Sequence, residues 1–510
     1  MEFHLNVGGF LKRAAERHMD KPALIFENQR VSFQQLNSRV NRLAQALLSL
    51  GAQKGDKIGL LFFNSPVFVE TFLAAVKIGA IAVPLNVRLV GRELIYILKH
   101  CDARFLFLGQ DFMEGIGGIR ERLGQVEQYI VAGDSSSAVM QHYETLLSGA
   151  VDEEPQVLVK EEDAAAILYT SGTTGRPKGA LITHKNIIWN EINYIIDKDL
   201  RVADVALLVS PLFHAGGLNN LLTHIFLGST LVLHRTFDPQ SVLETIEKEK
   251  ITVLQTIAPT MYNMILQLPD LERYDLSSVR AVMSGGAVLP VETKKKIQDL
   301  FPHAGIQDSY GLTEVTSTGT ALKPELALKK IASVGKPFFT LEARLIDEKG
   351  GEVAPGQVGE IVLRGPNVMK EYYKDPEATE STFRDGWLHT GDLAKKDEEG
   401  FLYIVDRKKD MIISGAENIY PKEIEEVLYT HPKILEAAVI GVPDPVWGEA
   451  VKAVVVLKPG EEMTQEEVIA FCKANLASYK KPRSVDFVSS LPKTAFGKIA
   501  KVLLRESYRG

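Results

Sequence analysis

Residues 169–179 read YTSGTTGRPKG and directly follow the apolar segment AAAIL (164–168). Three glycines, two cations and four Ser or Thr hydroxyls make a loop that offers backbone N–H groups, O–H donors and positive charge. Such a loop at the end of a strand suits the binding of polyphosphate. It is not a Walker loop, because Pro177 stands where the GxxxxGK[ST] spacing needs its second glycine. GIGGIR (115–120) likewise fails the dinucleotide fingerprint, because Arg120 replaces the last glycine.

The chain before this loop alternates between helical and strand patterns. Ser32 and Gln35 fit a capping box at the start of a helix with apolar periodicity. The apolar runs 57–63 and 81–86 predict strands, and residues 67–80 between them predict a helix. This alternation is typical of α/β proteins with a mostly parallel sheet.

The pattern changes toward the C-terminus. We interpret the acidic stretch 151–163 as a separator from the preceding region, and DRKKD (406–410) as a second break. Short strands punctuated by glycine predict a small antiparallel, barrel-like unit at about 333–405. Beyond the second break lies an α+β tail, in which Thr464 caps a helix and Cys472 belongs to its apolar face. The predicted fold class is therefore α/β, with a large N-terminal domain (1–407) and a small α+β C-terminal domain (408–510).

Length and composition are those of an ordinary folded enzyme. The chain has 510 residues, 45% of them hydrophobic and 24% charged, which suits about three packing units. Its formal charge of -7 gives no general attraction to nucleic acid or anionic lipid. Two cysteines, Cys101 and Cys472, allow neither a disulfide framework nor a four-cysteine zinc site. Because the first residues also lack a secretory pattern, we expect a cytoplasmic protein.

Residues 205–234 contain no Asp, Glu, Lys or Arg. A membrane span needs roughly 20 mostly apolar residues, and Pro211 together with Gly216 and Gly217 interrupts this stretch. We therefore expect a buried strand, loop and helix, and no integral membrane segment. Peripheral membrane association and the oligomeric state stay open.

Further segments accompany the loop in a fixed order along the chain. They are PLFHAGGL (211–218), SGGAVLP (284–290), QDSYGLTE (307–314), SVGKP (333–337), GEIVLRGPNVMKEYY (359–373), DGWLHTGDLA (385–394), DRKKDMIISGAENIYPKEIE (406–425) and LPKTAFGK (491–498). Together with YTSGTTGRPKG, this series resembles the adenylate-forming superfamily, which comprises acyl-CoA synthetases, adenylation domains of peptide synthetases, and luciferases. The resemblance covers essentially the whole chain.

The resemblance implies a chemistry in two steps. A carboxylic acid and ATP first give an acyl-adenylate and pyrophosphate, and the thiol of coenzyme A then releases AMP. The first step brings two anions together, so it needs a cation between them. That cation is expected to be Lys498, and Mg2+ held by Glu314 is expected to neutralise the polyphosphate. In such enzymes a mobile C-terminal domain turns at a hinge between the steps, and here that hinge is expected at Lys409.

The resemblance also implies roles for the other motif residues. Catalysis is assigned to Lys498, His214, Thr313 and Glu314. Binding of ATP or AMP is assigned to Thr170, Ser171, Gly172, Thr173, Thr174, Gly175, Lys178, Gly285, Gly286, Ala287, Asp308, Ser309, Tyr310, Gly311, Thr313, Asp392, Arg407 and Lys498. The acyl pocket is assigned to Phe213, His214, Gly217 and Leu218, and the coenzyme A channel to Ser414 and Gly415. Ala416 departs from the pattern, since many relatives have glycine there, and this leaves the shape of that turn open.

The sequence identifies the reaction more clearly than it identifies the acid that reacts. Because residues 213–223 are apolar and uncharged, a hydrophobic acid fits better than an amino acid, whose ammonium would need a buried partner. We expect a medium- or long-chain fatty acid, with an aryl or phenylpropanoid acid as the alternative. A luciferase-like oxygenase and a non-catalytic nucleotide sensor are the alternatives from other functional classes.

Overall fold

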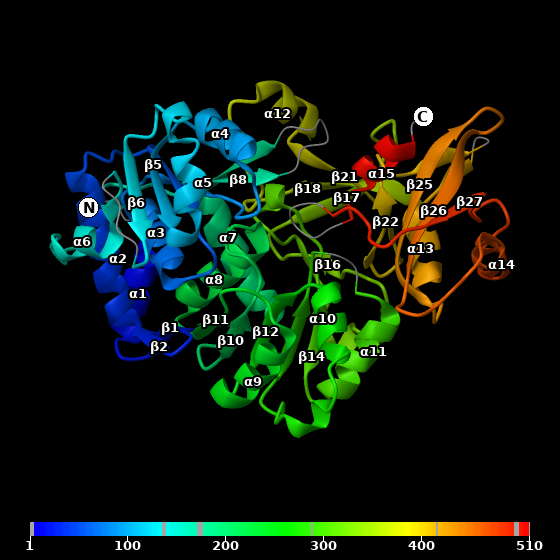
Figure 1. Ribbon diagram of the computed structural model, residues 1–510, viewed down its shortest axis with the longest axis horizontal. Helices are drawn as coiled ribbons and strands as arrows, with labels where there is room; N and C mark the ends of the chain where they lie inside the picture. Colours follow the sequence, from blue (N-terminus) through cyan, green and yellow to red (C-terminus); the bar gives the residue numbers. More distant parts are fainter. Residues whose placement is uncertain are drawn as a thin grey trace. The chain divides into compact units, whose positions relative to one another are not determined.

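The computed structural model describes residues 5–134, 139–170, 177–286, 289–414, 417–493 and 499–508. It forms two compact units, one made of Met1–Glu342 with Leu363–Leu388 and the other of Ala343–Val362 with His389–Gly510 (Figure 1). The α/β class with a large N-terminal and a smaller C-terminal part is confirmed. The boundary at 407/408 was placed by an expected hinge motion, which a division by contacts does not test, so that boundary stays a prediction.

One sheet of the first unit positions most of the motif residues. Among the described residues it has seven strands, in the order β14 (Gly305–Asp308), β13 (Ala281–Ser284), β12 (Val253–Ile257), β10 (Val205–Leu208), β11 (Thr230–Leu233), β1 (Pro22–Phe26) and β2 (Gln29–Ser32). All neighbours from β14 to β1 pair in parallel, and only the edge strand β2 is antiparallel. Their carboxyl ends therefore meet at one edge of the sheet.

The second sheet of this unit carries the strands around the glycine-rich loop. Its described strands are ordered β19 (Glu371–Tyr372), β9 (Lys178–Thr183), β8 (Ala164–Thr170), β4 (Ile81–Pro84), β3 (Lys57–Leu61), β5 (Ala103–Gly109), β6 (Gln128–Ala132) and β7 (Gln141–His142). The predicted strands and their parallel pairing are confirmed for β3 and β4. The interpretation of 151–163 as a separator was wrong, because β8 beyond it pairs in parallel with β4.

Helices cover both sheets of the first unit (Figure 1). The capping box of Ser32 and Gln35 forms at the start of α2, as predicted. The described helices are α1 (Gly8–Arg17), α2 (Phe33–Ser49), α3 (Pro66–Lys77), α4 (Gly91–His100), α5 (Met113–Gly117), α6 (Tyr143–Ser148), α7 (His184–Lys198), α8 (Ala215–Leu227), α9 (Pro239–Glu249), α10 (Pro259–Leu266), α11 (Val291–Leu300) and α12 (Pro376–Thr382). The uncharged stretch 205–234 forms the buried strand β10, a loop, helix α8 and strand β11, as predicted.

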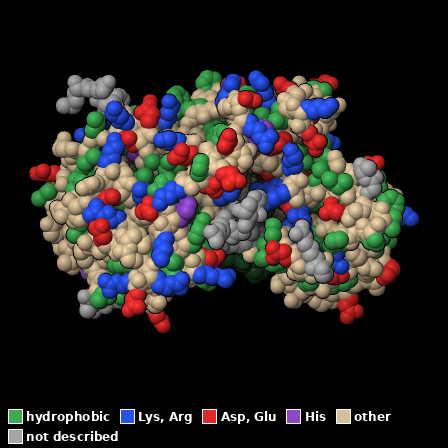
Figure 2. Space-filling model, turned by 90° about the horizontal axis from the view of Figure 1, so that it is seen from above, with side chains coloured by type: hydrophobic (Ala, Val, Ile, Leu, Met, Phe, Trp, Pro, Cys, Tyr) green, Lys and Arg blue, Asp and Glu red, His purple; other side chains and the backbone are tan. Residues whose placement is uncertain are grey.

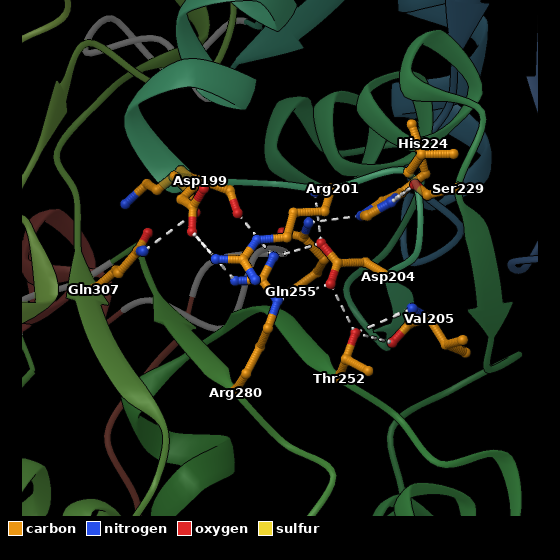
Figure 3. Close-up of polar contacts among 12 residues, drawn as sticks. Asp199, Arg201, Asp204, Val205, His224, Ser229, Thr252, Gln255, Arg280 and Gln307 are labelled. Atoms are coloured by element: carbon orange, nitrogen blue, oxygen red, sulfur yellow. Dashed lines mark hydrogen bonds and ion pairs between the residues drawn. The ribbon is translucent and has the colours of Figure 1, made fainter.

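Buried polar contacts join helices α7 and α8 to strand β12 of the seven-stranded sheet. The hydroxyl of Tyr194, on α7, donates to Gln255 Oε1 of β12 over 3.2 Å. His224, on α8, accepts from Gln255 Nε2 over 2.7 Å, and its other ring nitrogen lies 2.6 Å from Ser229 Oγ (Figure 3). Burial lowers the pKa of His224 to about 4, so the ring is neutral and bonds through both nitrogens.

A second polar cluster fixes the amino ends of the parallel strands. Asp204, just before β10, accepts from Arg280 Nε over 2.8 Å and from Thr252 Oγ1 over 3.0 Å (Figure 3). Burial raises the pKa of Asp204, but the hydrogen bonds of Arg280 outweigh that effect, and the pKa is lowered overall. The sheet is thus anchored at one edge, and the motif residues lie at the opposite, carboxyl edge.

The second unit contains two small sheets. The first contains β17 (Glu342–Ile346), β18 (Val358–Arg364), β21 (Trp387–Lys396), β20 (Phe383–Arg384) and β22 (Leu402–Arg407), of which β20 lies in the residue range of the first unit. Its recorded pairing among the described residues runs from β17 through β18 to β21, which also pairs with β20 and β22. The barrel-like closure of this unit stays a prediction. A separate short pair, β15 (Thr320–Ala321) with β16 (Lys336–Pro337), belongs to the first unit.

The C-terminal sheet forms the core of the α+β tail. Its described strands are β24 (Glu417–Ile419), β23 (Ile412–Ser414), β26 (Gly448–Leu457), β25 (Ile434–Asp444) and β27 (Ser484–Phe487), with helices α13 (Pro421–Tyr429), α14 (Gln465–Asn475) and α15 (Lys501–Tyr508). The capping box at Thr464 is confirmed. Cys472 is fully buried in this core, and burial raises the pKa of its thiol to about 11, which agrees with a packing role.

Charged side chains cover the surface. Figure 2 shows basic and acidic side chains intermingled over the face that it presents. No helix among the described residues combines the length and the apolar character that crossing a membrane requires.

Candidate active site

The carboxyl edge of the seven-stranded sheet collects three of the predicted segments. Gly285 and Gly286 follow β13, residues 309–314 follow β14, and residues 209–214 follow β10. Open parallel sheets bind ligands at this edge. The sequence predicted these residues as one site, and the topology brings their three segments to one edge of one sheet.

The glycine-rich loop connects two antiparallel strands of the other sheet. Thr170, the last residue of β8, pairs with Lys178, the first residue of β9. The predicted phosphate-binding residues Ser171, Gly172, Thr173, Thr174 and Gly175 lie outside the described residues. The ammonium of Lys178 lies 5.2 Å from the centre of the Tyr372 ring, a cation–π distance.

Tyr372 also holds the predicted metal carboxylate. Its hydroxyl donates to Glu314 Oε1 over 2.6 Å, and the backbone N–H of Met369 donates to the Glu314 carbonyl over 2.8 Å. Tyr372 is buried, and burial raises the pKa of its hydroxyl, so it stays a donor. Lys178 therefore contacts the ring of Tyr372, and Glu314 contacts its hydroxyl. The sequence had not identified Tyr372 as a site residue.

The chain after Glu314 is held in an uncommon conformation. Thr316 and Ser317 have φ values of +58° and +103°, which cost free energy in residues with a side chain. The fully buried Asn367 fixes this turn: its amide donates to the carbonyls of Val315 and Thr318 over 3.2 and 3.3 Å. A Cβ on Gly311 would lie 1.9 Å from the Ser317 oxygen, so only glycine fits there.

His214 is the N-cap of α8. Its Nδ1 accepts from the Gly216 N–H over 3.2 Å, so the neutral ring carries its proton on Nε2. A Cβ on Gly217 would lie 2.1 Å from the Pro211 oxygen, so only glycine fits at position 217. The other predicted acyl-pocket residues, Phe213 and Leu218, are both buried.

The predicted adenine-binding segments are tied to each other. Ser309 Oγ donates to the Ser284 carbonyl over 3.3 Å, which joins the ends of β14 and β13. Gly286 has φ of +81°, a conformation that favours glycine. The Tyr310 N–H donates to Thr320 Oγ1 over 3.1 Å. Ala287 lies outside the described residues.

Asp308 has a different environment from the rest of the predicted nucleotide site. Its carboxylate forms an ion pair with Lys294, and both side chains are buried. Burial raises the pKa of Asp308, and Lys294 partly offsets that rise. Its side chain thus has a partner inside the protein, and a direct contact with nucleotide stays a prediction.

The predicted ribose-binding pair lies in the second unit. Asp392 of β21 is opposite Arg407 of β22 in the ladder, and Arg407 Nε lies 3.1 Å from Asp392 Oδ1. Asp392 is buried and Arg407 is exposed. The sequence predicted that both residues contact one ribose, and the structure makes them neighbours.

The remaining predicted residues of the second unit lie in or beside turns. Lys409 lies in an exposed turn, after which Asp410 forms an ion pair of 2.8 Å with Arg505. Ser414 is the last residue of β23. Gly415 and Lys498 lie outside the described residues. The segment that contains Lys498 is bracketed by a bridge between Lys493 and Ile499.

Glu314 suits a magnesium ion that is shared with a nucleotide. Mg2+ commonly binds through one or two carboxylates together with substrate phosphates. Glu314 is half-buried, Tyr372 occupies one of its oxygens, and the other has no protein hydrogen bond recorded among the described residues. Within those residues no group of three or more His, Cys, Asp or Glu gathers to form a metal cage, so the donor set fits a phosphate-bridged ion.

Comparisons with known proteins match this arrangement over the whole chain. A family model described as AMP-binding enzyme matches residues 11–373, and one described as AMP-binding enzyme C-terminal domain matches residues 423–498. A feruloyl-CoA synthase from Amycolatopsis sp is 41% identical over 94% of both chains. An indoleacetate–CoA ligase from Aromatoleum aromaticum is 38% identical over 98% of both. A long-chain-fatty-acid–CoA ligase from Mycobacterium tuberculosis is 37% identical over 94% of this chain and 93% of its own.

Solved structures give the same result. An anthranilate CoA ligase in complex with anthranoyl-AMP superposes with a TM-score of 0.92 and 31% identity, over 100% of this chain and 98% of that one. An o-succinylbenzoate coenzyme A synthetase from Bacillus subtilis, in complex with ATP and a magnesium ion, superposes with a TM-score of 0.86 and 32% identity, over 98% of both chains.

Proposed function

The chain belongs to the AMP-binding enzyme family, as an AMP-forming acid–CoA ligase, and on this premise we propose that it activates an aryl carboxylic acid. The observation that carries the adenylation step of this proposal is the geometry at Tyr372, where a predicted phosphate-binding cation and a predicted metal carboxylate meet one side chain. Such a pairing serves a reaction in which pyrophosphate leaves and its charge must be neutralised.

In the first half-reaction, a carboxylate oxygen of the acid attacks the α-phosphorus of ATP, and the bond from that phosphorus to the bridging oxygen breaks. Thr170, Lys178 and the loop between them hold the polyphosphate in this proposal. Glu314 holds Mg2+, which supplies positive charge at the phosphates when bound. Thr313 donates to the α-phosphate, and Lys498 lies between the two anions.

Two groups of residues bind the nucleoside part in this proposal. Gly285, Gly286 and Ala287 let adenine approach the backbone, and Tyr310 stacks on its face. Asp392 accepts from the ribose hydroxyls, with Arg407 beside it. The support is the burial of Asp392 next to Arg407, since one carboxylate can accept two donors.

In the second half-reaction, the thiol of coenzyme A loses its proton and attacks the acyl carbonyl carbon, and AMP leaves with both electrons of the acyl–oxygen bond. His214, with its proton on Nε2, acts as the gate beside the carboxylate. The C-terminal domain changes position at Lys409, and Ser414 with Gly415 lines the coenzyme A channel. The exposed turn at Lys409 supports this hinge.

The acid is the point at which the proposal departs from our first expectation of a linear fatty acid. Relatives named for arylic acids are 41% and 38% identical, against 37% for one named for long-chain fatty acids. A long alkyl tail needs a continuous apolar tunnel. A small cavity beside α8 has the buried polar side chains of Glu191 and Asn219 on its wall, which suit a polar substituent better than an alkyl chain.

The test is a kcat/KM series for acid-dependent thioester formation, with benzoate and cinnamate compared with linear acids from C4 to C12. In an alkyl tunnel each added methylene would raise kcat/KM by up to about fourfold, since burying one CH2 contributes ~0.8 kcal/mol. We expect a flat linear series and at least about tenfold higher values for an aryl acid. A steady rise to C12 that exceeds the aryl acids would restore the fatty-acid assignment.

A further inference from the structure

A small cavity lies between α7, α8 and the strands β8 and β9. Most of its walls are apolar, and the exceptions are Glu191 on α7, Asn219 on α8 and Thr316. Its size accommodates about one water molecule or one hydroxyl group. Polar side chains on the wall of such a closed space need hydrogen-bond partners inside it.

Glu191 offers one acceptor to this cavity. The side chain is 1% exposed, and its Oε1 has no hydrogen-bond partner among the described residues. Its Oε2 is hydrogen-bonded to the hydroxyl of Thr223, which also lies 2.8 Å from the Asn219 carbonyl oxygen. Burial raises the pKa of Glu191 well above its ordinary value, and hydrogen bonds from Thr223 and Asn190 only partly offset this.

These contacts define the direction of each hydrogen bond. The hydroxyl of Thr223 donates to Glu191 Oε2, and the Asn219 carbonyl oxygen lies 2.8 Å from the same hydroxyl. Oε1 is therefore the Glu191 oxygen that can accept a hydrogen bond from a group in the cavity.

Asn219 offers one donor beside it. The side chain is 4% exposed, its Oδ1 accepts from Asn190 Nδ2, and its own Nδ2 has no partner among the described residues. Asn190 is held in turn by Asn367, whose amide lies 3.4 Å away. The cavity therefore presents one acceptor and one donor, and a hydroxyl group satisfies both at once, since it donates one hydrogen and accepts another.

Residues of the cavity wall lie close in sequence to residues of the proposed reaction centre. Ala215 on its wall follows His214 directly, and Thr316 follows Glu314 by two residues. Leu218, which we had assigned to the acyl pocket, is also on its wall. The cavity therefore adjoins residues that we assign to acid binding.

We propose that Glu191 and Asn219 bind a hydroxyl group at the distal end of the acid, so that the substrate is a hydroxylated aryl acid. This inference rests on the proposed function, which supplies the acid-binding role of the region around α8. Without a hydroxylated substrate, one water molecule occupies the position. A site built for a hydroxyl strongly disfavours the analogue that lacks it, because the two buried polar groups are then left without partners.

The test compares cinnamate with its 2-, 3- and 4-hydroxy derivatives in acid-dependent pyrophosphate exchange. Wild-type protein should favour one isomer over cinnamate by at least about tenfold in kcat/KM. Glu191→Leu, which removes the acceptor, should reduce this ratio to within about twofold of one. Glu191→Gln keeps a carbonyl oxygen that can accept at the cavity, so the ratio should fall by less than about threefold.

Glu70→Gln is the matched control, because Glu70 is another buried carboxyl of the same unit, bound to Arg39 and Tyr143 and absent from the cavity wall. It should leave the ratio unchanged. If every hydroxy isomer stays within about threefold of cinnamate in the wild type, the site binds only water and the inference is overturned while the ligase function holds. Should Glu191→Leu not fold, the wild-type ratio and Glu191→Gln still decide. Absence of exchange with every acid would overturn the proposed function as well.

Discussion

At the scale of single residues, the environment of Glu314 depends on a residue 58 positions away. Tyr372 donates to Oε1 over 2.6 Å, which leaves the other oxygen to face a metal ion. A hydrogen bond to a charged group contributes about 1.5–3 kcal/mol, and the buried hydroxyl has the further effect of fixing the carboxylate's orientation. Tyr372 is therefore a positioning residue in this account, since it acts through Glu314.

Tyr372→Phe should raise the Mg2+ concentration that gives half-maximal pyrophosphate exchange by about tenfold, because Glu314 loses the donor that orients it. The KM for the acid should change by less than about twofold. Tyr373→Phe is the control, because the neighbouring ring packs edge-on against His100 and has no recorded contact with Glu314. Equal Mg2+ dependence in the wild type and Tyr372→Phe would show that Tyr372 does not position the metal carboxylate.

Sequence motifs predicted Glu314 but not the role of Tyr372 or Asn367. Both lie in the quoted segment 359–373, so the resemblance marked the region without assigning these side chains. Their contacts to residues 314–318 depend on how β19 pairs with β9 and on a turn at positive φ in Thr316 and Ser317. Neither feature follows from local periodicity, because β-branched and hydroxyl residues rarely adopt that conformation.

At the scale of elements, helix α8 has a residue of proposed function at its start and a residue with a structural role near its end. His214 caps its start and is proposed to act beside the acid, whereas His224 near its end bonds Gln255 and Ser229 in the interior (Figure 3). The sequence predicted a buried strand, loop and helix for 205–234, and local signals sufficed for that. It did not predict that His224 of this stretch would join α8 to β12.

The pKa of His224 predicts an acid-sensitive step in stability. The folded ring has a pKa of about 4 and the unfolded one about 6.5, so below pH 6.5 only the unfolded chain takes up the proton. Stability is therefore lost as the pH falls, by about 2 kcal/mol between pH 7 and pH 5 from this residue. His224→Gln removes this contribution, so the Tm gap between wild type and variant should shrink over that range.

Thermal unfolding at pH 7, 6 and 5 measures this gap. His303→Gln, at an exposed position after α11, is the control and should unfold in parallel with the wild type at each pH. A gap between wild type and His224→Gln that stays constant from pH 7 to pH 5 would contradict a buried neutral ring.

At the scale of the whole molecule, the sequence predicted the class of the fold better than its connections. Helix caps and apolar strands are local, and those at Ser32 and Thr464 formed as expected. The pairing of β1 with β11 joins residues about two hundred positions apart, and no local pattern encodes it. The same limit explains the error at 151–163, where an acidic surface segment was taken for a boundary inside one sheet.

The proposed reaction also belongs to this scale, because it requires two half-reactions in one protein. Lys498 serves only the first, where two anions meet. The hinge at Lys409 serves the passage from the first to the second, and proline there would fix φ near −65° and block a rotation about that bond. Substitution of Lys498 should therefore abolish the first half-reaction, and substitution of Lys409 the second.

The most direct test measures both half-reactions separately in the wild type, Lys498→Ala and Lys409→Pro. Acid-dependent pyrophosphate exchange without coenzyme A reports the first, and thioester formation from pre-made acyl-adenylate reports the second. The wild type should perform both and release AMP only when coenzyme A is present. Lys498→Ala should lose exchange by at least about a thousandfold and keep thioester formation, and Lys409→Pro should do the reverse. Equal loss of both half-reactions in each variant, or no acid-dependent exchange in the wild type, would contradict the account.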